Sequence, residues 1–250
     1  MNNKFLYIAN WKAYLSYKQS KEFIAQNKDA LKTLGNDYSL IICPSFDALA
    51  TVGHDLQGTH IALGAQDCSA HQPGAYTGQV LAESLKQIGC AYSIIGHSEV
   101  KTEHHETIPT IAQKAIELLN HGITPIICTG ETAKDYEIDR GAQVIEEQLT
   151  PIFNAISKKE RNGYQFAVAY EPLWAINGGN IPTPEYLKRQ ISLIRQLAAQ
   201  ITPQYTSTVL YGGGVDEVTI GAFNNFPDLD GVVIGKASTD FQTLQKIVLS

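Results

Sequence analysis

The chain has 250 residues, of which 44% are hydrophobic and 18% charged, and these proportions predict one large buried core. Its formal net charge is −6 and its isoelectric point is about 5.6, which argues against nucleic acid or an anionic membrane as partner. An anionic ligand would therefore need a local binding site.

The four cysteines lie far apart in the sequence and form no C-x-x-C pair. Most stand in or beside apolar runs, so we expect buried free thiols in a reducing compartment at Cys43, Cys68, Cys90 and Cys128. The apolar run at 5–9 is too short for a secretion signal or a membrane span. We therefore expect a soluble, cytoplasmic protein with no membrane partner.

Eight short apolar runs recur along the chain, and a segment with helical periodicity follows each of them. Most of the runs are apolar without alternation, which is typical of parallel strands buried on both faces. The runs cover residues 5–9, 40–43, 61–65, 92–95, 123–128, 166–170, 208–211 and 231–234.

Two of the helical segments carry clear start or stop signals. In 107–121 the apolar residues share one face, and Gly122 is the expected stop. In 184–201 apolar residues recur at three- and four-residue steps, with Thr183 as the expected N-cap and Pro184 at the first helical position.

The repeated β-then-α order leaves two α/β architectures open, a closed (βα)8 barrel or a long doubly wound sheet. No G-x-G-x-x-G motif follows any of the runs, which argues against the sheet. Strand count and chain length favour a single-domain (βα)8 TIM barrel over residues 1–250. The active site of such a barrel lies at the carboxyl ends of its strands.

Chemically capable side chains stand at three of these strand ends. Lys12 follows the first strand and has the charge to hold a phosphate or form a Schiff base, although a lone lysine there favours a solvated surface position. His97 follows the fourth strand at an expected helix start, where the helix dipole favours a neutral imidazole; its alternative is a structural histidine. Glu171 ends the sixth strand, with an ordinary solvated glutamate as its alternative.

Two other strand ends carry polar side chains for which we predict supporting roles. Gln66, after the third strand, is expected to orient a neighbouring polar side chain. Glu131, after the fifth, is expected to be structural and to pair with a basic neighbour. The loop at 68–79 has little apolar content, and we expect it to pack against something outside the chain.

The segment that follows Glu171 has the composition of a lid. Its front is stiff and apolar and its back is rich in glycine, which suits a loop that covers a ligand, excludes water and offers backbone N–H groups to an anion. Glycine-rich turns at 211–215 and 234–238 end the last two strands, where barrels often bind phosphate. The predicted lid residues are Pro172, Leu173, Trp174, Ala175, Ile176, Asn177, Gly178 and Gly179.

From end to end, the chain resembles the triosephosphate isomerase family. The motifs that carry the resemblance stand in the same order and at the ends of the predicted strands. They are N-W-K at 10–12, G-A-Q at 64–66, G-A-Y-T-G at 74–78, G-H-S-E at 96–99, C-T-G-E at 128–131, A-Y-E-P-L-W-A-I at 169–176, Y-G-G at 211–213 and I-G at 234–235.

The resemblance implies a barrel, usually a homodimer, that interconverts dihydroxyacetone phosphate and glyceraldehyde 3-phosphate with no metal or other cofactor. It makes Glu171 the base that removes the proton beside the carbonyl, and His97 the neutral group that polarises that carbonyl. By the same resemblance, Lys12 stabilises the negative charge of the substrate and of the developing enediolate. Asn10 helps to position the substrate, and Glu99 has a supporting role. Such chemistry needs a carboxylate over one carbon and a donor at the oxygen, and no residue cluster here has metal-ligand spacing.

The phosphate contacts that the resemblance implies are backbone N–H groups of Asn177, Gly214, Gly235 and Lys236. Gly214 replaces a serine that is usual in the family, while Asn177 and Lys236 each replace a glycine. Losing one charge-assisted hydrogen bond costs about 1.5–3 kcal/mol. We therefore expect substrate binding weaker by roughly one to two orders of magnitude, which the charge of Lys236 partly offsets.

The loop that the resemblance docks into a neighbouring subunit includes Tyr76, Thr77 and Gln79. The family usually has a glutamate at Gln79 and an arginine at Val100, and these two pair across the interface. Glu106 matches a further acidic partner of that arginine, which is absent here. Ala13 replaces a methionine on the dimer side of the site. We therefore expect a homodimer with a weakened or rearranged interface.

Three alternative functions stay open at this point. The first is an isomerase of a related four-carbon ketose phosphate, because the phosphate turn and the lid are altered. The second is a Schiff-base aldolase that acts through Lys12. The third is a non-catalytic barrel that binds a phosphate ligand.

Overall fold

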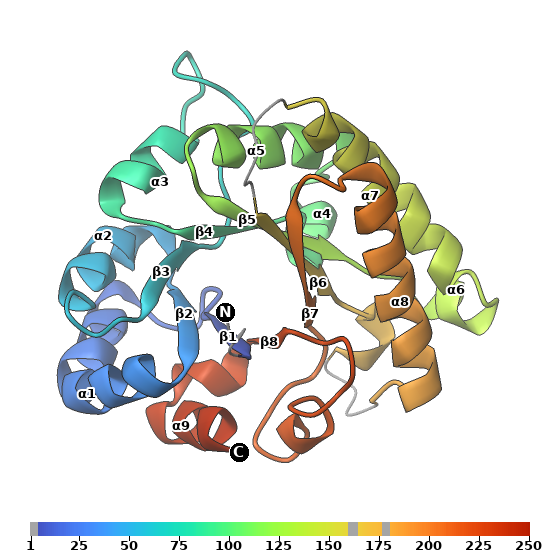
Figure 1. Ribbon diagram of the computed structural model, residues 1–250. Coiled ribbons are helices and arrows are strands. Elements are labelled where there is room, and N and C mark those ends of the chain that lie inside the picture. The colour runs from blue at the N-terminus through green and yellow to red at the C-terminus, as the bar shows by residue number, and fades with distance from the viewer. Residues whose placement is uncertain (1–4, 160–164, 177–180) are drawn as a thin grey trace.

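The computed structural model of the protein describes residues 5–159, 165–176 and 181–250. Eight parallel strands close into a barrel in chain order, and helices surround it (Figure 1). This closed barrel confirms the (βα)8 prediction and excludes the doubly wound sheet. The strands are β1 Leu6–Asn10, β2 Ser39–Cys43, β3 Ala62–Ala65, β4 Tyr92–Ile95, β5 Thr124–Thr129, β6 Gln165–Tyr170, β7 Thr206–Tyr211 and β8 Gly231–Ile234.

The barrel closes where β8 pairs with β1. Leu6 lies opposite Gly231, and Ala9 lies opposite Ile234. A Cβ atom at Gly231 would lie 2.1 Å from the carbonyl oxygen of Leu6, so the first of these pairs requires glycine. Closure pairs the backbone groups of all eight strands and leaves no exposed sheet edge.

The helices lie outside the barrel (Figure 1), and all of them except α4 and α6 carry buried residues. Within the described ranges, no helix combines the length and the apolar content that crossing a bilayer requires. The α-helices are α1 Tyr17–Asp37, α2 Phe46–Asp55, α3 Ala82–Ile88, α4 Ser98–Glu103, α5 Ile108–Asn120, α6 Ala133–Glu137, α7 Gly141–Ser157, α8 Pro184–Ile201 and α9 Phe241–Leu249. Short 3-10 helices follow three of the strands: η1 Leu173–Ala175, η2 Ile220–Ala222 and η3 Lys236–Thr239.

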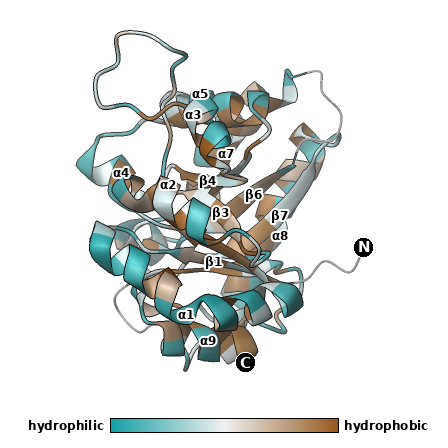
Figure 2. Cartoon of the chain, turned by 90° about the vertical axis from the view of Figure 1, so that its left-hand side faces the viewer, coloured by the Kyte–Doolittle hydropathy of each residue, from teal (hydrophilic) through white to brown (hydrophobic). Residues whose placement is uncertain are grey.

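Each strand contributes to two apolar layers. Successive side chains on a strand point to opposite faces, so Ile8 packs in the barrel interior while Tyr7 and Ala9 pack against the helices. Burial on both faces explains why the strands read as continuous apolar runs, and the strands are mostly brown in Figure 2. The inner layer consists of Ile8, Ile41, Cys43, Ile94, Ile126, Cys128, Ala167, Ala169, Leu210 and Val233.

The helix signals in the sequence are confirmed. The Thr183 hydroxyl caps α8 by accepting the backbone N–H of Tyr186 at 3.3 Å, and Pro184 is the first helical residue. Gly122, just beyond α5, has a φ of +65°, a left-handed conformation that glycine adopts without steric cost.

Some strands extend beyond the apolar runs that predicted them. β7 begins at Thr206 because Thr206 pairs with Gln165 of β6, and both side chains are exposed. Backbone pairing sets these strand ends, whereas apolar patterning reports only side-chain burial. The pattern therefore placed the strands correctly and left out their polar first residues.

We predict that the thiols of the native protein react slowly. All four cysteines are buried and free. Burial raises the pKa of Cys90 to about 12 and raises the pKa of each of the other three thiols above its usual range. Because the thiolate is the reactive form, a thiol reagent at about pH 8 should label the four thiols quickly only after unfolding in guanidinium. Fast labelling of the native protein would contradict this expectation.

Candidate active site

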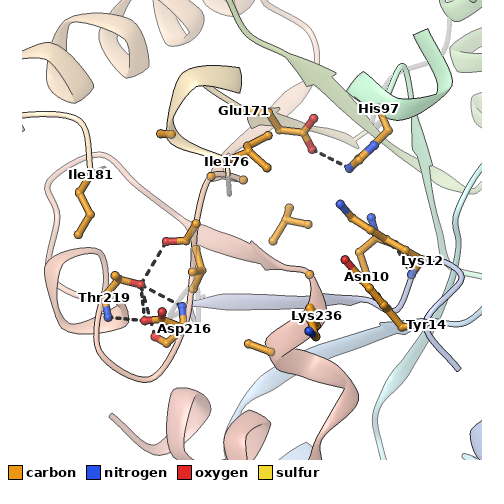
Figure 3. Close-up of a pocket in the computed structure, with 18 residues that line it drawn as sticks. Asn10, Lys12, Tyr14, His97, Glu171, Ile176, Ile181, Asp216, Thr219 and Lys236 are labelled. Atoms are coloured by element: carbon orange, nitrogen blue, oxygen red, sulfur yellow. Dashed lines mark hydrogen bonds and ion pairs between the residues drawn. The ribbon is translucent and has the colours of Figure 1, made fainter. Parts of the chain in front are cut away.

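A cavity of about 290 Å3 lies at the carboxyl ends of the strands. Asn10 and Lys12 reach it from the end of β1, His97 from the end of β4 and Glu171 from the end of β6 (Figure 3). Parallel strands in a closed barrel bring these sequence-distant positions to one rim, as predicted.

Glu171 follows β6 directly and is almost fully buried, with 2% of its surface exposed. Its backbone N–H donates to the carbonyl of Thr129 at 2.7 Å, which continues the β5–β6 pairing by one residue. A Cβ atom at Gly212 would lie 2.7 Å from Glu171 Cγ, so the glycine after β7 makes room for this side chain. The carboxylate lines the cavity (Figure 3).

His97 is the N-cap residue of α4, as the sequence predicted. Its Nδ1 accepts the backbone N–H of Glu99 at 3.3 Å, so the proton of the neutral imidazole belongs on Nε2. Nε2 faces Glu171, 3.5 Å from Oε1 (Figure 3). The ring can therefore present one N–H to a ligand in the cavity.

Lys12 has a left-handed backbone, with a φ of +48°, which is uncommon for a residue other than glycine. Gln66 holds this conformation, since its Nε2 donates to the carbonyls of Lys12 at 2.9 Å and of Cys43 at 3.0 Å. The expected partner of Gln66 was a polar side chain, and the structure shows backbone carbonyls instead. Lys12 Nζ forms an ion pair with Glu99 at 2.6 Å.

Asn10 and Glu99 both support Lys12. Asn10 is 4% exposed, lines the cavity and accepts the Lys12 backbone N–H on Oδ1 at 3.2 Å. Glu99 lies outside this cavity and lines a neighbouring one on the other side of Lys12. Its carboxylate therefore holds the ammonium group of Lys12 without lining this cavity.

The two glycine-rich turns form the opposite wall of the cavity. Gly214, Gly235 and Lys236 line it, whereas Asn177 lies outside the described residues. Ala237, within the predicted turn at 234–238, also lines it, whereas sequence reasoning missed Tyr14, Ile181, Asp216, Thr219 and Val233.

Asp216 and Thr219, two of the missed residues, belong to a turn that the sequence could have predicted. The Asp216 carboxylate accepts the backbone N–H groups of Val218 and Thr219, both at 2.9 Å, a turn typical of aspartate. Burial raises the pKa of Asp216, but the hydrogen bonds from Thr219 and Val218 outweigh burial and lower this pKa overall. The aspartate turn at 216–219 follows the predicted phosphate turn directly, and this position in the sequence indicates that it lines the same cavity.

Glu131 is fully buried behind the site, and its partners differ from the prediction. It accepts hydrogen bonds from Tyr170 Oη at 2.8 Å, Trp174 Nε1 at 2.7 Å and Tyr186 Oη at 3.0 Å. Among the described residues no basic side chain pairs with it, so the predicted ion pair was wrong. Three neutral donors satisfy the carboxylate without the desolvation cost of a buried cation.

The first residues of the predicted lid are fixed to this buried carboxylate. Residues 172–176 contain η1, and the Leu173 N–H donates to the Glu131 carbonyl at 3.0 Å. The indole of Trp174 stacks on Tyr136 at 4.0 Å and meets Tyr186 edge-on. Asn177, Gly178 and Gly179 lie outside the described residues.

The loop at 68–79 projects from the barrel (Figure 2). Tyr76, Thr77 and Gln79 border a groove at its base, which Val100 also lines. The His71 and Tyr76 rings stack at 3.9 Å and stiffen the loop.

A buried lysine stands behind this groove. Lys114 of α5 forms ion pairs with Asp67, at 2.7 Å, and with Glu106. Burial lowers the pKa of Lys114, but attraction to Asp67 and Glu106 outweighs burial and raises it. Glu106, which the sequence left short of its arginine partner, therefore has a lysine partner within its own chain.

A carboxylate, an imidazole N–H and an ammonium group thus meet in one cavity at the rim of a closed barrel, a combination typical of general acid–base catalysis. Fold and site together define a (βα)8 barrel of the acid–base enzyme class.

A family model described as triosephosphate isomerase matches residues 5–250. Proteins named triosephosphate isomerase are similar over nearly the whole chain. That of Aquifex aeolicus is 35% identical over 249 residues, or 98% of either chain. That of Ralstonia nicotianae is 37% identical over 93% of either chain. That of a Wolbachia of Brugia malayi is 37% identical over 98% of this chain and 96% of its own. The chain belongs to the triosephosphate isomerase family.

The hydrogen bonds to Glu131 give a stability prediction. Tyr186→Phe removes one of its three donors and keeps the ring. A hydrogen bond to a charged group contributes about 1.5–3 kcal/mol, so the free energy of unfolding in urea should fall by about that amount. Tyr17→Phe, which changes an exposed hydroxyl, should alter it by less than about 0.5 kcal/mol. Equal stability of the two variants would contradict the assignment.

Proposed function

We propose that this protein interconverts dihydroxyacetone phosphate and glyceraldehyde 3-phosphate through an enediolate. The observation that carries the proposal is the buried Glu171 carboxylate, which faces His97 Nε2 at 3.5 Å across a cavity that Lys12 also lines. Membership of the triosephosphate isomerase family supports the same reaction.

In this proposal Glu171 removes the proton from the carbon beside the carbonyl and returns it to the neighbouring carbon. The C–H electron pair becomes the C=C bond and the carbonyl π pair moves to the oxygen, which gives the enediolate. A proton also passes from the hydroxyl oxygen to the former carbonyl oxygen, so the product has the same atoms as the substrate. Glu171 is a competent base because its carboxylate is nearly dry and not saturated by donors.

His97 and Lys12 are proposed to stabilise the developing negative charge. The histidine donates through Nε2, since Nδ1 is already an acceptor. Lys12 adds a positive charge that Glu99 and Asn10 hold in place, through the ion pair and the backbone hydrogen bond. Donors fixed before the reaction stabilise such charge without a reorganisation cost.

The phosphate is proposed to bind at the glycine-rich wall. Backbone N–H groups of Gly214, Gly235 and Lys236, together with Asn177, are the proposed donors, and residues 172–179 are the proposed lid. The positive charge of Lys236 is proposed to offset part of the phosphate binding that is lost because Gly214 has no hydroxyl. The Asp216 carboxylate is engaged by its own turn, which limits its repulsion of the phosphate.

The test of the reaction is a coupled assay with glyceraldehyde 3-phosphate, comparing the wild type with Glu171→Asp. Shortening the base by one methylene withdraws it from the substrate carbon, so kcat should fall by about a hundredfold or more with little change in KM. Glu185→Asp, an exposed glutamate on α8, is the matched control and should keep full activity. An inactive wild type would contradict the proposal and direct the assay to four-carbon ketose phosphates.

We further propose that the protein is a homodimer with a rearranged interface. The loop bearing Tyr76, Thr77 and Gln79 is exposed, and large apolar side chains such as Tyr14 and Phe46 lie exposed nearby. Lys114 pairs with Glu106 inside the chain, so Glu106 has a partner although valine stands at position 100. The proposed interface therefore lacks the arginine–glutamate pair that the resemblance implies between positions 100 and 79.

A dimer without its intersubunit ion pair should dissociate on dilution. Sedimentation velocity should show a monomer–dimer equilibrium in roughly the micromolar range, about 8 kcal/mol of association free energy. Tyr76→Asp should shift the population to monomer, whereas Tyr136→Asp, on the lid side of the barrel, should not. A single dimeric species far below micromolar concentration would contradict the rearranged interface.

We also propose that the chain forms one domain and acts in the cytoplasm. The barrel uses elements from β1 to β8, and α9 packs against η3 and the first helix, α1. Four buried free thiols suit a reducing compartment.

A further inference from the structure

The turn after β5 lies directly beneath Glu171. The carbonyl of Thr129 accepts the backbone N–H of Glu171 at 2.7 Å. A Cβ atom at Gly130 would lie 1.9 Å from the carbonyl oxygen of Glu171, so the two backbones are in direct contact. Any shift of this turn must therefore move the peptide that carries the carboxylate.

The paired register of β5 and β6 ends at this turn. Thr129 and Tyr170 are the last partners in the ladder, so Gly130 has no residue of a neighbouring strand to bond with. The side chain of Gln148, on α7, takes that place. Thr129 Oγ1 donates to Gln148 Oε1 at 2.8 Å, the Gly130 N–H donates to the same oxygen at 3.2 Å, and Gln148 Nε2 donates to the Gly130 carbonyl at 3.1 Å.

These bonds matter because few polar side chains hold the carboxylate, which is otherwise placed by packing against Gly212. Glu171 Oε1 lies 3.5 Å from His97 Nε2, a long contact, and the Cys128 thiol is a further partner. The position of its oxygens therefore depends on its backbone, and its backbone rests on the turn that Gln148 holds. An amide suits this task because it offers an acceptor and a donor at once to the N–H and the C=O of one residue.

We propose that Gln148 is a positioning residue for Glu171, acting through the turn at Thr129 and Gly130. This inference rests on the proposed function, in which Glu171 is the base. Gln148 does not line the cavity, so it touches neither the substrate nor the phosphate. Its loss should disturb the alignment of the base and leave ligand binding intact.

The test compares Gln148→Leu, which removes all three hydrogen bonds at similar volume, with the wild type. Misplacing a reacting group by about 1 Å can cost about a hundredfold, so kcat should fall by about 10- to 100-fold. KM, and the inhibition constant of inorganic phosphate, should stay within about twofold because the glycine-rich wall is untouched. Gln143→Leu is the matched control, an exposed glutamine on the same helix, and should keep the wild-type kcat.

Two further variants separate positioning from general stability. Gln148→Glu keeps both acceptor bonds and should recover part of the lost kcat. Thr129→Val removes one bond, and adding it to Gln148→Leu should cause little further loss, because both act through one turn. An unchanged kcat in Gln148→Leu, with or without a lower Tm, would overturn the proposal. A joint collapse of kcat, KM and phosphate inhibition would overturn it as well.

Crystal structures keep this test independent of the proposed reaction. In Gln148→Leu the turn and the Glu171 carboxylate should be displaced by about 0.5 Å or more relative to the wild type, a shift large enough to disturb catalysis. An unmoved carboxylate would overturn the positioning role even if the wild type is active. A wild type that does not isomerise triose phosphates would overturn the proposed function, while the carboxylate shift would still decide the role of Gln148.

Discussion

The pairing of β8 with β1 is the contact on which the rest of the molecule depends. The backbone carbonyl of Asp230, just before β8, extends this pairing by accepting the Leu6 N–H at 2.8 Å, and its carboxylate accepts the Val209 N–H of β7 at 2.7 Å. Closure turns eight successive strand ends into one ring. Asn10 and Glu171 therefore face the same cavity although most of the chain separates them. Without closure, the functional side chains would be spread along an open sheet.

Two buried carboxylates near this rim are set apart by their surroundings. Glu131 takes three hydrogen bonds from neutral donors, which satisfies its oxygens and ties it to Trp174 of η1. Glu171 keeps oxygens directed at the cavity, and its nearest imidazole nitrogen is 3.5 Å away. A carboxylate saturated by donors has little acceptor capacity left for a ligand, whereas Glu171 lines the cavity with acceptor capacity to spare. Burial alone does not distinguish these two roles.

The buried charges beside the groove that Val100 lines are paired within the chain. Lys114 of α5 pairs with Glu106 and Asp67. A buried carboxylate without a partner is costly, so the positive charge must come from some nearby element. Here it comes from α5 of the same chain.

Much of the fold and of the candidate site followed from the sequence alone. The strand count, the caps of α5 and α8, and the strand-end positions of Lys12, His97 and Glu171 are local patterns, because each depends on residues a few positions apart. Only the tertiary structure decided the partners of Glu131 and Gln66, because these lie on other strands and helices. A buried polar side chain can be satisfied by a backbone carbonyl or a phenol as well as by a charged group. The sequence does not indicate which of these partners the fold will place beside it. Barrel closure selects those neighbours.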